Sequence, residues 1–385
     1  MLQKKKTIDM VVAIALLIAG LFTFVSLFGN FAAAKTNFHA SGGMNFIDLL
    51  KDGSKAIQIG FENDYILFSV ALIYLLSIII FFIGLVLFLT FGIIGMINVI
   101  HHLQGKKELK TNPLLIAVFS KAACDLFIFY LVYSDFTQNN YGTIIKQETM
   151  LGWGSILSII SCFIILIAYS FRYIYFARLL KKNLLVPAMM CGGVLLVLIA
   201  SIIGSHGQFH VTDLNSETYS KMNGLDLTIT AISIDAREPN VMTNDIRLCE
   251  IGGIFTITSP LLCLVVFDFF KISKRKKDFL MVLDGTIFLV FTLIGSVLIS
   301  SSSTATGYSS YQTGTGLIVS LVLTSIATIL FLVCLIIHKD RNITLKPEEL
   351  AEEMISYKEE TSSSSESSDE SSKEEAKEDN INAAL

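Results

Sequence analysis

The most regular feature of this sequence is the recurrence of long apolar runs between short polar segments. Eight runs reach roughly 20 residues, the helix length needed to cross a bilayer core of about 30 Å. Each run is expected to be helical, because a helix satisfies its own backbone hydrogen bonds in lipid. The runs cover residues 10–33, 65–100, 113–133, 151–177, 183–205, 250–270, 279–301 and 315–338.

The composition agrees with this pattern and excludes a soluble enzyme domain. Hydrophobic residues make up 53% of the 385 positions and charged residues 16%, against about 25% charged in ordinary soluble domains. Five of the six cysteines lie inside apolar runs, so no disulfide framework is expected. The predicted fold class is an all-α polytopic membrane protein with eight transmembrane helices.

The second run, 65–100, is long enough for one overlong helix of about 54 Å or for two cramped crossings. With one crossing, 18 Lys and Arg residues fall on one side of the membrane and seven on the other. The positive-inside rule then places both termini in the cytoplasm, and we expect a plasma-membrane protein. A second crossing in this run would break the charge pattern.

The first run ends in Ala32, Ala33 and Ala34, a small-residue pattern that signal peptidase could cut. A cleaved signal peptide is therefore one interpretation of residues 1–34. A retained helix is favoured, because the apolar stretch is near 20 residues and a signal core has about 7–15.

The loop lengths indicate two tandem four-helix units, residues 1–182 and 183–342. Each unit has a long and then a short external loop, at 34–64 and 134–150 in the first and at 206–249 and 302–314 in the second. This layout resembles the claudin-like tetraspan arrangement in tandem. The tryptophan and paired cysteines that mark that family are missing from the long loops, so the resemblance implies no activity and no site residue.

The two long loops share a short pattern. Phe38-His39 and Phe209-His210 are each followed, 14 residues after the histidine, by a glycine in an Asp-Gly or Asn-Gly pair, at Gly53 and Gly224. Such pairs favour turns, and the residues after each turn alternate as a strand would. The pattern predicts a small external α/β lobe built from both loops. The external loops carry 12 Asp and Glu residues, so this face is expected to be acidic.

Charged residues inside a membrane are costly and are functional candidates by default. Lys121 and Asp125 lie near the middle of the third run with a spacing of four residues, which places them on one helical face. Asp284 in the seventh run has a comparable position. These residues form either a polar path or a structural pair that joins helices, and the structural pair is the favoured interpretation of Lys121 and Asp125.

Other candidate chemistry lies outside the apolar runs. His206, His210, Asp213 and Glu217 would form a divalent metal site if they shared one helical face, although a polar surface cluster accounts better for the same residues. Catalytic and nucleotide-binding motifs are absent from the sequence, so we expect no enzyme, no cofactor and no nucleic-acid partner.

The C-terminal segment, residues 343–385, is acidic and rich in serine and glutamate. From residue 346 onward it has 13 acidic and four basic residues, and its second part lacks the apolar residues needed for a core, which predicts disorder. Acidophilic kinases would accept serines with glutamate three positions later. Such serines are Ser363, Ser367, Ser371 and Ser372.

Together these features predict a non-enzymatic interaction or envelope-organising protein. Its partners would be the lipid bilayer and an unidentified protein that meets the external lobe. The alternative is a small-solute transporter or channel with a polar path near Lys121, Asp125 and Asp284.

Overall fold

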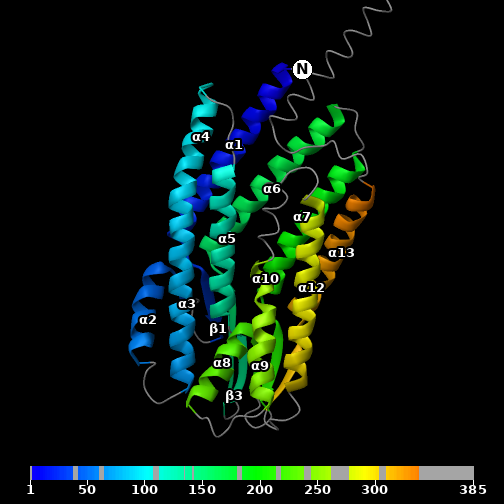
Figure 1. Ribbon diagram of the computed structural model, residues 1–385. Helices are drawn as coiled ribbons and strands as arrows, with labels where there is room; N and C mark the ends of the chain where they lie inside the picture. The colour runs from blue at the N-terminus through cyan, green and yellow to red at the C-terminus, as the bar shows by residue number, and fades with distance from the viewer. Residues whose placement is uncertain are drawn as a thin grey trace, which may run out of the picture.

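The computed structural model shows a bundle of long helices with a β-sheet at the end opposite the N-terminus (Figure 1). It describes the chain in segments with short gaps between them. These are residues 2–37, 42–59, 65–106, 112–133, 135–140, 143–179, 184–213, 218–237, 244–261, 277–302 and 309–337.

Seven helices within these segments are long and apolar enough to cross a membrane. Those of the first half are α1 (Leu2–Ser26), the continuous helix α3 (Tyr65–Leu87), η1 (Phe88–Gly92) and α4 (Ile93–Leu103), then α5 (Asn112–Val132) and α6 (Trp153–Leu179). Those of the second half are α7 (Leu185–Gly204), α12 (Lys277–Ser302) and α13 (Thr315–Ile337). The predicted run 250–270 is described as far as residue 261, as α9 (Asn244–Thr256) and α10 (Thr258–Leu261).

The prediction of one overlong helix in the second run is confirmed. Apolar helix continues for 36 residues from Phe68 to Leu103 without a reversal of direction. A single π-helical turn, η1, lies in its middle, where Phe88 is buried and its ring packs against Gly92. Such turns widen a helix locally without ending it.

Two antiparallel helix pairs form the centre of the bundle. In the first half α1 lies along α6, and in the second half α7 lies along α13. The apolar core runs through both pairs and includes Leu16, Ile165, Val194 and Phe331. Positions in this core and positions that face lipid are both apolar in the sequence, because neither environment offers water.

Seven strands form one antiparallel sheet with the order β2-β1-β4-β3-β6-β5-β7. The first-half strands are β1 (Ala32–Thr36), β2 (Gly42–Met44), β3 (Asp135–Asn140) and β4 (Thr143–Leu151). The second-half strands are β5 (Phe209–Asp213), β6 (Thr218–Met222) and β7 (Ser309–Thr313). Pairing of β3 with β6 joins the two halves into one sheet.

The sheet has a covered face and an open face. Phe209 and Val211 point to the covered face and pack with Leu227. On β4, the alternate residues Ile144 and Met150 are exposed on the other face. A period of two along a strand is what a half-buried sheet requires.

The predicted strands after the two turns are wrong. Ile57 and Ile59 belong to helix α2 (Phe46–Ile59), and Leu225, Leu227 and Ile229 belong to helix α8 (Gly224–Arg237). Residues 225–229 are all buried, so the helix has no solvent-facing side that would reveal a period of 3.6 residues. Local alternation of apolar and polar letters therefore misled the prediction.

The predicted turn at Asp52-Gly53 is also wrong, because both residues lie in the interior of α2. The lack of a side chain at Gly53 has a packing role, since an added Cβ would lie 2.9 Å from Cδ1 of Ile78 on α3. Gly224 begins α8 instead of closing a hairpin. Both glycines therefore serve helix packing or helix initiation.

Candidate functional site

The most concentrated polar chemistry in the bundle is centred on Lys121 and Asp125 of α5. Lys121 Nζ contacts Asp125 Oδ1, and each side chain is only 1% exposed. The spacing of four residues places both side chains on one helical face, as predicted. The two opposite charges are therefore neutralised locally.

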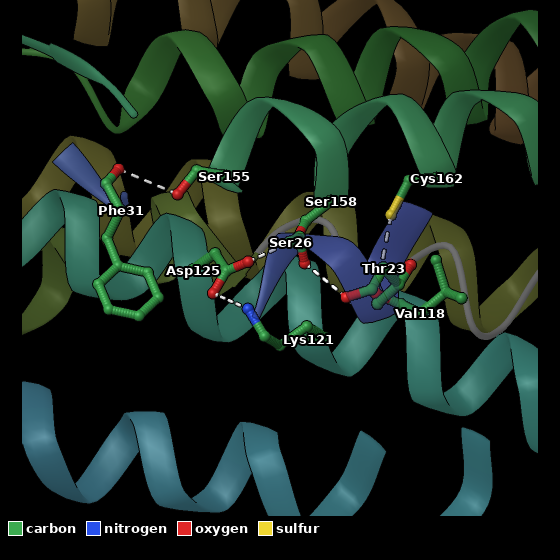
Figure 2. A network of polar contacts seen from close by, with 9 residues as sticks. All are labelled: Thr23, Ser26, Phe31, Val118, Lys121, Asp125, Ser155, Ser158 and Cys162. Carbon is green, nitrogen blue, oxygen red and sulfur yellow. Dashed lines mark hydrogen bonds and ion pairs between the residues drawn. The ribbon is translucent and has the colours of Figure 1, made fainter. Parts of the chain in front are cut away.

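A chain of hydroxyl groups connects this pair to two other helices (Figure 2). Ser158 of α6 donates to Asp125 Oδ2 at 2.5 Å. Ser26 Oγ of α1 lies 2.9 Å from Ser158 Oγ and donates to the Thr23 carbonyl at 2.6 Å. Both oxygens of Asp125 are thereby partnered, and α5 is tied to α1 and α6.

The same cluster reaches the base of the sheet. Lys121 Nζ lies 5.6 Å from the ring centroid of Phe31, the residue before β1. The Phe31 carbonyl accepts hydrogen bonds from Ser155 Oγ at 3.0 Å and from Gly152 N at 2.9 Å. The position of β1 is therefore coupled to the buried ion pair, through one cation–π contact and the start of α6.

Asp284 is placed elsewhere. The contacts in Figure 2 connect α1, α5 and α6, whereas Asp284 lies on α12 and is partly exposed. The sequence did not single out Ser26 and Ser158, which complete the network. Their hydroxyl groups face a charged residue on another helix. This could not be recognised from the sequence without knowing how the helices pack.

A second buried network joins the two halves of the molecule, and only Asn223-Gly224 within it was noted in the sequence. Tyr130 of α5 donates to Gln208 Oε1 at 2.9 Å, and Gln208 Nε2 donates to the carbonyls of Gly204 and Thr256 at 3.2 Å. Asn223 Nδ2 donates to the Tyr130 carbonyl at 2.8 Å. These bonds satisfy the ends of α7 and α9.

Gln208 also closes this junction through its own backbone and the start of α8. Its amide donates to Asn223 Oδ1 at 3.2 Å, while its side-chain Oε1 accepts the Gly224 amide at 2.9 Å. Its carbonyl accepts the amide of Gly314, before α13, at 2.7 Å. Gln208 therefore contacts α7, α8, α9 and the residue before α13 in the second half, and α5 in the first.

A third polar contact lies toward the opposite end of α1 and α6. Arg172 NH2 lies 2.7 Å from Asp9 Oδ1, and both side chains are largely buried. A long cationic side chain near the end of a span commonly extends to the membrane boundary, but the partner on α1 keeps Arg172 inside the helix pair.

The predicted metal site is not assembled by a shared helical face. The helix α7 ends at Gly204, before His206, and His210 lies on β5. His206 Nδ1 lies 2.8 Å from the Ile202 carbonyl, and its ring packs 4.7 Å from Phe129. Burial lowers the pKa of His206, which favours its neutral form.

His210 takes part in a different contact. Its ring stacks on Tyr219 of the neighbouring strand, with Tyr219 Oη at 2.5 Å from Nδ1. Partial burial and the nearby Lys221 lower the pKa of His210. Among the described residues, no group of three or more His, Cys, Asp or Glu side chains could hold a metal ion.

Several predicted site residues lie outside the described segments. Asp213 ends β5, but its side chain is not described. Phe209, a candidate residue of the shared Phe-His pattern, is fully buried and packs with Leu227. The residues outside the description are Phe38, His39, Glu217, Ser363, Ser367, Ser371 and Ser372.

These features define a mostly helical, multi-pass membrane protein with buried polar junctions between its helices. No family model, curated protein or solved structure matches the chain.

Proposed function

We propose that this protein is a non-enzymatic interaction or envelope-organising protein of the plasma membrane, with eight crossings, both termini in the cytoplasm and an external lobe that meets a protein partner. The lobe comprises the seven strands with α2 and α8. The observation that carries the proposal is the single sheet running through both halves of the chain.

Equivalent contacts in the two halves support a tandem duplication. An added Cβ on Gly152 would lie 2.1 Å from the Asn30 carbonyl oxygen, and one on Gly314 would lie 2.5 Å from that of Gly207. Asn30 and Gly207 are 177 positions apart. Both glycines precede the last helix of their unit, so each allows that helix to start against the end of the unit's first helix.

The neighbouring turn repeats the relation. Gly154 approaches the carbonyl oxygen of Ser26, and Gly316 approaches that of Ile203, again 177 positions later. The strand pairing repeats the same pattern, because β1 pairs with β2 and β4 as β5 pairs with β6 and β7, and β1 and β5 begin 177 positions apart. Phe209 thus corresponds to Ala32, so the offset between Phe38 and Phe209 does not give the structural correspondence.

The open face of the sheet offers a surface for a partner. Ile144, Met150 and Tyr219 are exposed large residues on three positions of this face, together with the exposed Lys146. Exposed apolar and aromatic side chains on a rigid scaffold are the usual components of protein interfaces. Lys35 and Lys221 flank them, so this part of the lobe is less acidic than the loop composition suggested.

The transporter alternative has less support. Alternating access needs the two halves to separate, whereas β3 and β6 are paired at Asp135 to Thr137. The candidate polar path is occupied by an ion pair whose members contact each other and Ser158. These contacts favour a bundle held closed at the lobe end.

Photo-crosslinking in cells tests the proposed function. A photoreactive amino acid at Ile144 or Tyr219 should give a discrete protein adduct, and the same group at Ile329, exposed on the span α13, should not. Adducts at Ile329 alone would contradict a role of the lobe. With the photoreactive group at Ile144, a disulfide between Thr137→Cys and Tyr219→Cys, which are directly paired, should leave the adduct at the level of the same double variant in its reduced form. Loss of the adduct only on oxidation would favour a mechanism that separates the halves.

A further inference from the structure

We infer that the lobe-side surface of the bilayer meets a collar of four exposed side chains, Phe28, Ile47, Phe82 and Trp153, and that only the second half of the long α3–α4 helix crosses the hydrocarbon core. The partner of this collar is the lipid interface, where acyl chains meet headgroups. This assignment does not depend on which protein the lobe binds.

Two helices define the same thickness independently. Phe28, in the turn after α1, is 19 positions from Asp9, and on α6 Arg172 is 19 positions from Trp153. Each interval corresponds to about 28 Å at 1.5 Å per residue, close to the roughly 30 Å of a hydrocarbon core. Neither interval contains a charged residue.

Contacts between α1 and α6 align these levels. Asp9 and Arg172 form an ion pair at one end. At the other end an added Cβ on Gly29 would lie 3.0 Å from Cε3 of Trp153. The two helices therefore place a charged level and an aromatic level opposite each other, as expected at the two surfaces of a bilayer.

The collar residues project from the bundle at the aromatic level. Phe28 is 70% exposed and Ile47 is 72% exposed, while Trp153 and Phe82 are also exposed. Ile47 follows Phe46, which contacts the rings of both Phe81 and Phe82. Large exposed aromatic and aliphatic side chains are stable at the membrane interface and unfavourable in bulk water.

The level continues onto the long helix through Phe31. The ring of Phe81 lies 5.5 Å from that of Phe31, the residue before β1, which lies five residues after the end of α1. From Phe81, 20 residues lead to His101 in the last turn of α4, again about 30 Å. The interval between these residues has no charged side chain.

The first half of the run, residues 65–80, then extends roughly 24 Å beyond the bilayer. Protein covers part of it there. Leu72, Ile73 and Leu76 pack in one cluster with Leu225 and Ile229 of α8. Tyr74 and Ile78 pack in the cluster of Leu49 on α2. An apolar helix of this length is explained by two successive environments, the lobe core and the lipid.

The assignment also places Lys121 and Asp125 at modest depth. Ile128 of α5 shares a cluster with Phe31 and Phe81, so it lies at the collar level. Asp125 is one turn from it and Lys121 two turns, or about 5 and 10 Å inside the core. The ion pair therefore lies near the lobe, where charge costs less than at the bilayer centre.

Trp153 is the single tryptophan of the chain, so its fluorescence reports the level of the collar directly. The purified full-length protein would be placed in phosphatidylcholine vesicles that carry a nitroxide either on the headgroup or near the middle of the acyl chain. Trp153 should lose more intensity with the headgroup label. Stronger loss with the mid-chain label would overturn the assigned boundary.

Moving the tryptophan tests the long helix. In a Trp153→Phe background, Ile94→Trp should be quenched most by the mid-chain nitroxide, and Val70→Trp should be quenched by aqueous iodide with little loss to either lipid label. Both positions are exposed on the same helix. Equal mid-chain quenching at Val70 and Ile94 would overturn the inference that residues 65–80 lie outside the bilayer; Leu75→Trp replaces Val70→Trp if that variant fails to fold.

Two single lysine variants test the same assignment without purified protein. Ile94→Lys should lose most of its membrane-inserted protein, since a lysine at the centre of a span is unfavourable in lipid. Val70→Lys should accumulate near the level of the unmodified protein. Loss of both variants, with Val70→Gln retained, would contradict the assignment because a charge outside lipid should be tolerated.

Discussion

The two halves of the bundle are joined internally by different chemistry. In the first half, ion pairs connect Arg172 to Asp9 and Lys121 to Asp125, with Ser158 bridging the latter pair to α1. In the second half, α7 and α13 meet through close packing and single hydroxyl or thiol contacts, as at Gly193 and Ser320. The Asp9–Arg172 pair joins two helices and so favours one register between them, whereas small-residue packing depends on shape alone.

The largest loss of stability should come from removing one partner of the Lys121–Asp125 ion pair in the first half of the bundle. Lys121→Leu or Asp125→Leu should each lower the free energy of unfolding by about 3–5 kcal/mol, because the remaining charge stays buried without its partner. The double variant Lys121→Leu/Asp125→Leu should recover most of this loss. Thermal unfolding in detergent measures the series, and a double variant no better than the singles would show that the pair has a further role.

A second contrast lies at the starts of the helices α2 and α8. Asp48 of α2 accepts the Asn45 amide in a capping arrangement, while Asp226 of α8 is buried and its pKa is raised to about 7 by that burial. Burial therefore disfavours the charged form of Asp226. The loss of folding stability caused by this burial grows as the pH rises from about 4 to about 7. Asp226→Asn should raise stability at pH 7.5 by something on the order of 3 kcal/mol and have little effect near pH 4.

Asp48→Asn is the matched variant for this comparison. It should lower stability by roughly 1 kcal/mol at neutral pH because it weakens the start of α2. Melting temperatures between pH 4 and pH 8 distinguish the two aspartates. A stabilisation by Asp226→Asn that does not depend on pH would argue against the titration of this carboxyl group.

Close packing in the second half should respond to added volume. A Cβ on Gly193 would lie 2.4 Å from the Phe331 ring, whereas a Cβ on Gly192 would meet no atom within 4 Å. Gly193→Val should therefore cost about 1–3 kcal/mol or more, and Gly192→Val should not disturb the helix pair. Comparable losses in both variants would mean that helix propensity, not the contact with α13, decides the result.

The junction between the halves should also lose stability when its central side chain is removed. Gln208→Leu removes the partners of the Gly224 amide and the Tyr130 hydroxyl, which should cost about 1–3 kcal/mol. Thr212→Val serves as the control, because Thr212 lies on β5, the strand that follows Gln208, but outside this hydrogen-bond network. If both changes have equal effects, the Gln208 network stabilises the protein no more than a position on β5 does.

Particular residues show how far the sequence could lead. The apolar runs predicted the positions of the long helices, including the continuous helix through residues 88–92, because the length and apolar character of a span are local properties. The spacing of Lys121 and Asp125 also predicted their mutual contact, since both lie on one helix. The strands around residues 57 and 227 were wrong because these segments are covered on several sides by helices and sheet.

The sequence by itself determined the helical membrane-protein class, because a run of about 20 apolar residues has few stable alternatives in a bilayer. Only the tertiary structure decided which segments meet across the chain. The strands β3 and β4 come from a short loop without strong strand signals, and their pairing with β1 and β6 depends on contacts between distant residues. Ser158 reaches Asp125 and Gln208 reaches Tyr130 for the same reason: helix packing, which no local period encodes, brings these side chains together.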